Sequence, residues 1–141
     1  VEGIDLSDAM LTIARRKVPH ATFTQMDMRR LAFDQESFDG LLVAYSLIHI
    51  PTSDLPETLR GFYRVLKRGG YVLFITQRGK ADQLVDEGFR PNKKMFFNFF
   101  TKERLNKLLV DANFQLIAQE ENKSQDTDSM SDTIIYTVVR K

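Results

Sequence analysis

The sequence predicts an α/β fold built on a mostly parallel β-sheet. Strand-like and helix-like segments alternate over residues 1–112, an order typical of parallel strands joined by helical crossovers. The last two strand-like segments, residues 114–119 and 133–140, have no helical pattern between them, so we expect an antiparallel pair. A chain of 141 residues can bury one core but not two, which predicts a single domain, 1–141.

The composition is that of an ordinary globular protein and excludes several classes of function. Apolar residues make up 43% and charged residues 28%, which argues against a disordered or fibrous chain. The formal net charge is only +1, whereas general binding to nucleic acid requires an accumulated positive field, so no nucleic-acid partner is expected. The sequence has no cysteine, which excludes disulfides, thiolate metal sites and thiol nucleophiles, and no metal site is predicted. No apolar run approaches the length of a membrane span, and the cytoplasm is the expected location.

Two strands and one helix are predicted at the beginning of the chain. Residues 1–6 read as an apolar strand, and Ser7 is placed to cap a helix that continues to Lys17. Basic residues crowd the last turn of this helix, where the helix dipole favours cations, and Pro19 ends it. A short strand is expected at residues 21–25.

The middle of the chain predicts a buried strand, a helix and a further strand. Residues 40–45, GLLVAY, form a near-continuous apolar run, which is typical of a central strand buried on both faces. Asp54 with Glu57 predicts a capping box at the start of the next helix. The glycines at 69–70 predict a left-handed stop for that helix, before a strand at 71–76. The apolar stripe of the helix consists of Leu55, Leu59, Phe62 and Leu66.

The last part of the chain contains one irregular stretch and one clear helix. Residues 77–100 have no regular period, and we expect a short helix around 80–87 and an aromatic cluster at 96–100. Thr101 is placed to cap an amphipathic helix. Residues 122–132 are almost devoid of apolar side chains and are expected to form a solvated loop.

Two acidic residues stand where an open parallel sheet binds its ligands. Ligands of such sheets lie outside the carboxyl ends of the strands, and Asp5 and Asp27 each follow a predicted strand. An ionised carboxylate only accepts hydrogen bonds, so Asp5 could hold both hydroxyls of a ribose and Asp27 the exocyclic amine of an adenine. Each has a structural alternative: Asp5 could serve as a charge at a helix N-terminus, and Asp27 could bond its own loop backbone.

Five segments occur in order along the chain: GIDLSDAML, FTQMDMRRLAF, SFDGLLVAYSLIHI, RVLKRGGYVLF and FFTKERLNKLLVDANF. Together they resemble the class I S-adenosylmethionine-dependent methyltransferases of the small-molecule type, over nearly the whole chain. The resemblance implies a Rossmann-like, mostly parallel sheet with helices on both faces and a C-terminal antiparallel strand pair. It also implies S-adenosyl-L-methionine as the cofactor and a small-molecule methyl acceptor as the partner. No membrane partner is expected, because the sequence has no apolar run of sufficient length, and a homo-oligomer is compatible with the sequence. Asn113 departs from the glycine that the family usually has before the following Phe.

The resemblance assigns roles to particular residues. The acid that ends the first strand matches the family's ribose-binding acid, and the two residues that follow the second strand match its adenine-contacting pair. The end of the GLLVAY strand would pass beneath the methionine part of the cofactor. The predicted cofactor-binding residues are Asp5, Leu6, Asp27, Met28, Ala44 and Tyr45.

His49 is the candidate catalytic residue. By the resemblance it lies near the acceptor pocket, and imidazole is the side-chain type best suited to general-base chemistry near neutral pH. The cofactor brings its own leaving group and a positively charged sulfur, so alignment of the acceptor with the methyl group could suffice without a base. We therefore favour a structural role, in which His49 bonds loop backbone.

The resemblance has no counterpart upstream. The family's first strand, its glycine-rich cofactor loop and the following helix are missing, so we expect the domain 1–141 to be N-terminally incomplete. In the family's sheet order the absent strand lies between the strand ending at Asp5 and the strand 40–45. Its loss would leave two strand edges unpaired. The alternatives are that the two strands pair directly, that the segment 77–100 covers their edges, or that a partner chain donates a strand into this gap.

Two other functions stay open on the sequence alone. A methyltransferase-like module without the glycine loop could be a non-catalytic, partner-binding subunit. A glycine-rich stretch after a strand in the upstream sequence would exclude that function. A nicotinamide dehydrogenase domain also places an acid at the end of its second strand, but this does not account for Asp27 or for the terminal antiparallel pair.

Overall fold

The computed structural model describes residues 1–86, 94–124 and 131–141. The elements are, in chain order, β1 (Glu2–Asp5), α1 (Asp8–Lys17), β2 (Thr22–Gln25), β3 (Phe38–Ala44), the 3-10 helix η1 (Leu47–His49), α2 (Leu55–Val65), β4 (Leu66–Gln77), β5 (Gln83–Asp86), β6 (Lys94–Phe97), α3 (Lys102–Asp111), β7 (Gln115–Lys123) and β8 (Thr133–Arg140). No helix among these described residues is long and apolar enough to cross a membrane.

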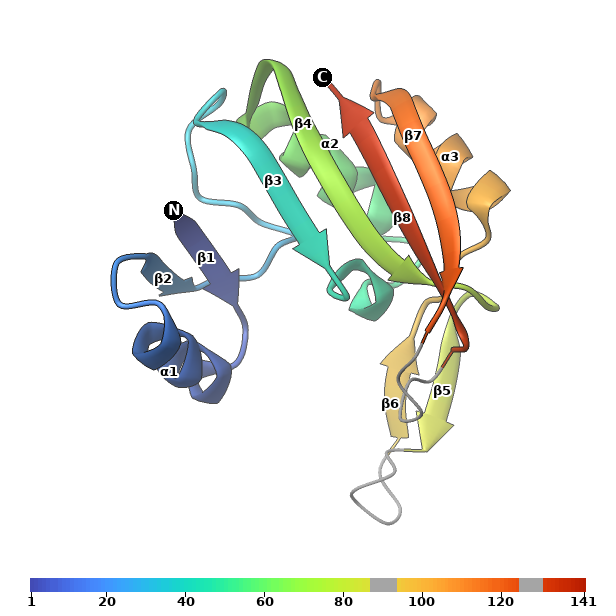
Figure 1. The fold of residues 1–141 in the computed structure, drawn as a ribbon, viewed down its shortest axis with the longest axis horizontal. Helices are drawn as coiled ribbons and strands as arrows, with labels where there is room; N and C mark the ends of the chain where they lie inside the picture. Colours follow the sequence, from blue (N-terminus) through green and yellow to red (C-terminus); the bar gives the residue numbers. More distant parts are fainter. Residues whose placement is uncertain (87–93, 125–130) are drawn as a thin grey trace.

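The strands form three groups (Figure 1). β1 pairs with β2 in parallel, and β5 pairs with β6 in antiparallel orientation. The other four strands form one sheet in the order β3-β4-β8-β7, in which β3 and β4 are parallel. β8 runs antiparallel to both β4 and β7, which confirms the predicted C-terminal antiparallel pair. In Figure 1, α2 and α3 both lie behind the four-stranded sheet, while α1 packs against β1 and β2.

The core lies between the four-stranded sheet and the two helices behind it. The predicted apolar stripe of α2 is confirmed, because each of its four side chains is at most 4% exposed. Val72 and Phe74 of β4 and Leu105 and Leu109 of α3 belong to the same buried cluster. Burial of such a side chain stabilises the fold by about 1.5 to 3 kcal/mol, so this layer is the main source of stability.

Two of the predicted helix caps are confirmed and a third is wrong. The Ser7 hydroxyl accepts a hydrogen bond from the Met10 N–H at 3.3 Å, and the Thr101 hydroxyl accepts one from the Arg104 N–H at 3.2 Å. Asp54 occupies the N-cap of α2, but its side chain makes no capping hydrogen bond. Its carboxylate is instead bonded to Arg29 and Ser53.

The end of α2 also differs from the prediction. The helix ends at Val65, and β4 begins at the next residue, so the glycines at 69–70 lie inside the strand. Gly69 does have a left-handed φ of 78°, as a glycine stop would. It falls at the irregularity where the pairing of β3 with β4 shifts register, between Phe38 and Gly40. The left-handed glycine therefore shapes a strand and does not end a helix.

The expected short helix around 80–87 is wrong for its described residues. Residues 83–86 form β5, and their burial alternates along the chain as it does in a strand. A period of two over four residues is too short to be recognised beside irregular flanks. The loop expected at 122–132 also begins later, because Asn122 and Lys123 pair with β8; residues 87–93 and 125–130 lie outside the described residues.

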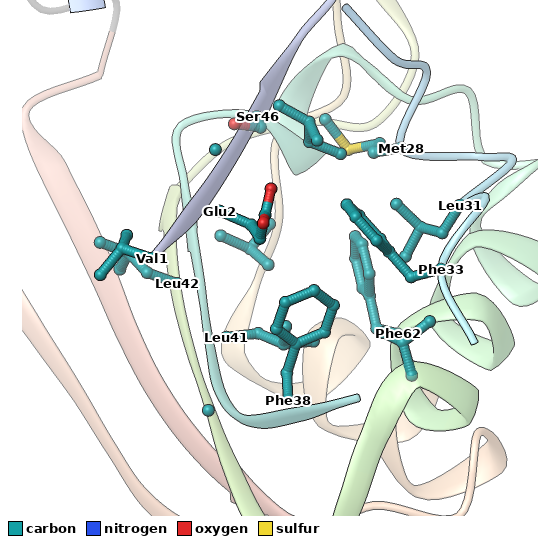
Figure 2. Close-up of a pocket in the computed structure, with 15 residues that line it drawn as sticks. Val1, Glu2, Met28, Leu31, Phe33, Phe38, Leu41, Leu42, Ser46 and Phe62 are labelled. Atoms are coloured by element: carbon teal, nitrogen blue, oxygen red, sulfur yellow. The ribbon is translucent and has the colours of Figure 1, made fainter. Parts of the chain in front are cut away.

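A groove separates β1 from β3, two strands that run in the same direction in Figure 1 but belong to different sheets. It has a volume of about 490 Å³ and is lined by β1, the segment 28–33, β3 and α2 (Figure 2). β3 is consequently an edge strand, and Leu42 is 67% exposed, although the sequence predicted a central strand buried on both faces. The groove is where the sequence analysis places an absent strand, and that strand stays a prediction.

Candidate functional site

The ends of β1 and β2 lie side by side. Asp5 and Gln25 are paired in the parallel ladder, and the Met26 N–H donates to the Asp5 carbonyl at 3.1 Å. The Gln25 side-chain amide donates to the Leu6 carbonyl at 2.8 Å, which ties the two strand ends together. The structure thus brings the predicted residues that follow β1 next to those that follow β2.

Asp5 is exposed, and its carboxylate is oriented by the chain that follows it. The Ser7 N–H donates to Asp5 Oδ1 at 2.7 Å, and Ser7 in turn caps α1. Leu6, between them, leaves 63% of its surface exposed. A carboxylate fixed at a strand end beside an exposed apolar side chain can accept hydrogen bonds from the hydroxyls of a ligand.

Asp27 forms the most extensive ion pair of the site. Arg29 binds it through its side chain, with Nε 2.9 Å and Nη2 2.6 Å from Oδ2, and its backbone N–H donates to Oδ1 at 2.9 Å. The bond from the Arg29 guanidinium holds the pKa of Asp27 below its usual value, more strongly than partial burial raises it. The contact with loop backbone foreseen as the structural alternative for Asp27 is therefore present.

Sequence reasoning missed the role of Arg29. Its third nitrogen, Nη1, donates to Asp54 Oδ2 at 3.0 Å, so one guanidinium joins the segment after β2 to the start of α2. The local signal was available, because an arginine two residues after an aspartate can reach back across a tight turn. The contact with Asp54, 25 residues away, left no local signal.

The remaining cofactor candidates are Met28, which is in the lining of the groove, and Ala44 and Tyr45, which are not. Met28 lines the groove together with Ser46, and Figure 2 shows both side chains at the same end. Ala44 ends β3, and Tyr45 follows with a φ of 53°, a strained value for a residue with a side chain. Such strain is concentrated at functional sites. Ala44 and Tyr45 are on the β3 side, whereas Asp5 and Leu6 are on the β1 side.

His49 is exposed on η1, and its ring contacts β6. Nδ1 lies 3.3 Å from the Phe96 carbonyl oxygen, and the ring centroid is 5.1 Å from that of Phe97. Because a carbonyl only accepts hydrogen bonds, Nδ1 carries the proton in this contact, and Nε2 has the lone pair when the ring is neutral. His49 thus makes the hydrogen bond to the backbone that a structural role requires. Its Nε2 has a free lone pair in the neutral ring, as a general base requires.

Asn98 holds the segment on either side of His49, and sequence reasoning missed it. Asn98 is fully buried; its N–H donates to the Ile48 carbonyl and its Nδ2 to the Ile50 carbonyl, both at 2.7 Å. Arg104 Nη1 donates to Asn98 Oδ1 at 2.8 Å. Partial burial lowers the pKa of Arg104. The available signal was a single polar residue inside the run MFFNFF.

Comparison with known proteins finds similarity to methyltransferases, both in sequence and in structure. Residues 1–70 match a family described as a methyltransferase domain. A demethylmenaquinone methyltransferase of Bacillus subtilis is 29% identical over 70% of this chain and 42% of its own length. One of Listeria welshimeri is 32% identical over 72% of this chain and 46% of its own. The chain thus spans less than half the length of these curated relatives.

Solved structures share the fold over the whole chain. An S-adenosylmethionine-dependent methyltransferase of Methanosarcina mazei superposes with a TM-score of 0.89 at 17% identity, covering 100% of this chain and 81% of its own. The 1,6-didemethyltoxoflavin-N1-methyltransferase of Burkholderia thailandensis, solved with S-adenosylhomocysteine, superposes with a TM-score of 0.76 at 18% identity, covering 100% and 60%. At these identities the superpositions establish the fold.

Proposed function

Because this chain belongs to the class I S-adenosylmethionine-dependent methyltransferases, we propose that the protein transfers a methyl group from S-adenosyl-L-methionine to a small-molecule acceptor. The observation that carries the proposal is the pair of carboxylates Asp5 and Asp27 beyond two adjacent parallel strands. Both are oriented by local backbone hydrogen bonds, and both lie at the edge where open α/β sheets bind ligands.

The residues at this edge fit the donor groups of the cofactor. Asp5 accepts hydrogen bonds from the ribose hydroxyls, and Asp27 accepts one from the exocyclic amine of adenine, because ionised carboxylates are acceptors only. Leu6 and Met28 offer apolar surface beside these carboxylates, and the turn at Ala44 and Tyr45 holds the methionine part. The bound cofactor supplies a positively charged sulfur and its own leaving group, so these residues bind and align.

Calorimetric titration of the full-length protein with S-adenosylmethionine and S-adenosylhomocysteine tests the proposal. Saturable binding of both is expected, with weaker binding when Asp5 or Asp27 is replaced. Absence of binding would contradict the proposal and favour the non-catalytic, partner-binding module instead.

The acceptor is proposed as a small molecule, and the relatives supply the first one to test. Because the curated relatives are demethylmenaquinone methyltransferases, demethylmenaquinone is the natural first acceptor. Transfer of a labelled methyl group from the cofactor to this acceptor, followed by mass spectrometry, would identify it. The cytoplasmic location and a homo-oligomeric state stay predictions.

We also propose that the complete domain contains a further strand in the groove between β1 and β3. Among the described residues, β1 pairs only with β2, and β3 only with β4, so each has one edge directed at the groove. A strand parallel to both would hydrogen-bond to the two edges at once. Parallel neighbours need a crossover, usually a helix, which would cover apolar side chains such as Leu42 that are exposed here. The curated relatives are more than twice as long as the part that this chain matches, which is consistent with such an additional segment.

A further inference from the structure

The guanidinium of Arg29 binds both oxygens of the Asp27 carboxylate through two of its nitrogens, like a fork. Arg29 Nε lies 3.1 Å from Oδ1 and 2.9 Å from Oδ2 of Asp27, and Nη2 lies 2.6 Å from Oδ2. The Arg29 backbone N–H adds a bond of 2.9 Å to Oδ1. Two oxygens held by the same residue leave the carboxylate little freedom to rotate.

The number of hydrogen bonds decides what this carboxylate can still accept. An ionised carboxylate offers about four acceptor positions. Three N–H groups of Arg29, those of the backbone, Nε and Nη2, occupy about three of them, because the single Nε–H is shared between the two oxygens. About one position remains, which is the number that a single N–H of an exocyclic amine requires.

The guanidinium is itself held from a second side. Nη1 donates to Asp54 Oδ2 at 3.0 Å, and the Ser53 hydroxyl donates to Asp54 Oδ1 at 2.9 Å. Asp54 precedes α2, whose apolar stripe is in the core, so Arg29 is connected to a helix that is packed into the core. The side chain of Arg29 is 43% exposed, and that of Asp27 is 25% exposed, so a ligand can reach the pair.

We propose that Arg29 is a positioning residue for cofactor recognition: it fixes the Asp27 carboxylate with one acceptor position left for the amine of adenine. This inference rests on the proposed function. A carboxylate already fixed loses little side-chain freedom when the ligand binds, and this preorganisation increases affinity and selectivity for the amine. Lysine could replace the charge of Arg29 but not its fork geometry.

Selectivity for the amine is the property to measure. S-adenosylhomocysteine is compared by calorimetry with its purine analogue, in which hydrogen replaces the 6-amino group. The full-length wild-type protein should bind S-adenosylhomocysteine about tenfold more tightly, as expected for a hydrogen bond to a charged group. In Arg29→Ala this preference should fall to about threefold or less, through weaker binding of S-adenosylhomocysteine alone.

Arg30→Ala is the matched control, because it removes the same charge from the next residue. Among the described residues, the Arg30 side chain makes no hydrogen bond or ion pair. Its backbone N–H donates to the Asp27 carbonyl, and its charge is the smallest of the causes that lower the pKa of Asp27. The control should keep the wild-type preference. Arg29→Lys should give an intermediate preference, and it serves as the second variant if Arg29→Ala is poorly folded by circular dichroism.

Each other outcome overturns a defined part of the reasoning. An unchanged preference in Arg29→Ala and Arg29→Lys would make Arg29 structural only. An equal loss of the preference in Arg30→Ala would show that positive charge near Asp27 is sufficient and that the fork geometry of Arg29 is not needed. If the wild type bound both ligands equally, Asp27 would not contact the amine, and the proposed function would stand without this inference. If the wild type bound neither, the proposed function itself would be overturned.

Discussion

Asp5 and Asp27 share a local geometry, in which a carboxylate at or just after the end of a parallel strand accepts the backbone N–H two residues further on. This turn is encoded by neighbouring residues, so the position of each carboxylate could be predicted from the sequence. Their other contacts differ, because Asp27 has Arg29 and Asp5 has only the local turn among the described residues. Substitutions at the two positions should therefore affect binding in different ways.

Asp5→Ala should weaken cofactor binding about tenfold or more, because two hydrogen bonds from ribose hydroxyls to a charged group are lost. Asp5 is exposed, so the melting temperature should change little. Calorimetry and thermal denaturation of the full-length protein measure the two effects. Asp8→Ala, which removes an exposed acid from the first turn of α1, is the control that should bind normally. Unchanged affinity in Asp5→Ala would remove Asp5 from the site.

Asp27→Ala should also weaken cofactor binding, and Asp27→Asn should do so more mildly. Asparagine keeps a carbonyl acceptor for the amine of adenine, although it loses the charge that pairs with Arg29. Dissociation constants of the two variants give the comparison. Equal losses would indicate that charge matters more than the acceptor.

The Asp27–Arg29 pair should make stability depend on pH in the acid range. Arg29 holds the folded-state pKa of Asp27 below the unfolded value of about 3.9, so the folded state binds fewer protons there. The stabilisation is fully present above about pH 4 and is lost as the pH falls through the lower folded pKa. Melting temperatures of wild type and Asp27→Asn should differ at neutral pH and converge as the pH falls through the lowered pKa of Asp27. A difference that stays constant with pH would contradict this origin.

His49→Ala should reduce turnover modestly or not at all, because the cofactor carries its own leaving group and alignment suffices. The bond from Nδ1 to the Phe96 carbonyl is consistent with a structural role. Steady-state kinetics of the full-length protein at saturating cofactor provide the measurement. A loss of several hundred-fold at unchanged cofactor affinity would identify His49 as a general base.

At the scale of elements, short-range signals predicted more than long-range ones. Ser7 and Thr101 cap their helices because a hydroxyl and an N–H three residues on are neighbours in sequence. Asp54 has the same signal but bonds to Arg29, 25 residues away. A local pattern cannot reveal such a competitor, which explains why the capping box failed while the helix itself was predicted.

Asn98→Ala should destabilise the contact between η1 and the segment that follows β6 by about 1 to 3 kcal/mol. The substitution leaves the Ile50 carbonyl without its donor and removes the Asn98 acceptor from Arg104, in a fully buried place. Asn106→Ala is the control, because Asn106 Oδ1 is buried without a partner among the described residues, and its removal should cost less. Urea unfolding of both variants checks the order, and equal losses would contradict it.

For the whole molecule, the sequence and the structure disagree most clearly at β3. The run GLLVAY is apolar at nearly every position, so both faces of the strand have apolar side chains. This is the pattern of a strand that is buried on both faces. In the structure β3 is an edge strand beside a groove, with Leu42 exposed. A strand in the groove and its crossover would reconcile the two, because they would give β3 the surroundings that its sequence predicts.

Residues 1–141 expressed alone are accordingly expected not to form a compact, cooperatively folded monomer. Two strand edges at the groove would keep unpaired backbone groups, each of which costs about 1 to 3 kcal/mol when buried. A strand with its crossover comprises about 30 residues or more, so a longer form of the protein should fold. Size-exclusion chromatography with light scattering and hydrogen exchange distinguish the two forms. A compact monomer of 1–141 with protected β1 and β3 amides would contradict the missing strand.

Leu42 and Leu84 offer a matched test of the groove in the full-length protein. Their exposures are nearly equal here, at 67% and 66%, so the structure alone predicts equal effects of substitution by alanine. If a strand and crossover cover β3, Leu42→Ala removes a buried side chain and should cost about 2 kcal/mol or more. Leu84 lies on β5, outside the lining of the groove, and Leu84→Ala should change stability by no more than about 0.5 kcal/mol. Chemical denaturation of both variants gives the comparison, and equal small losses would show that the groove and the exposed face of β3 stay open.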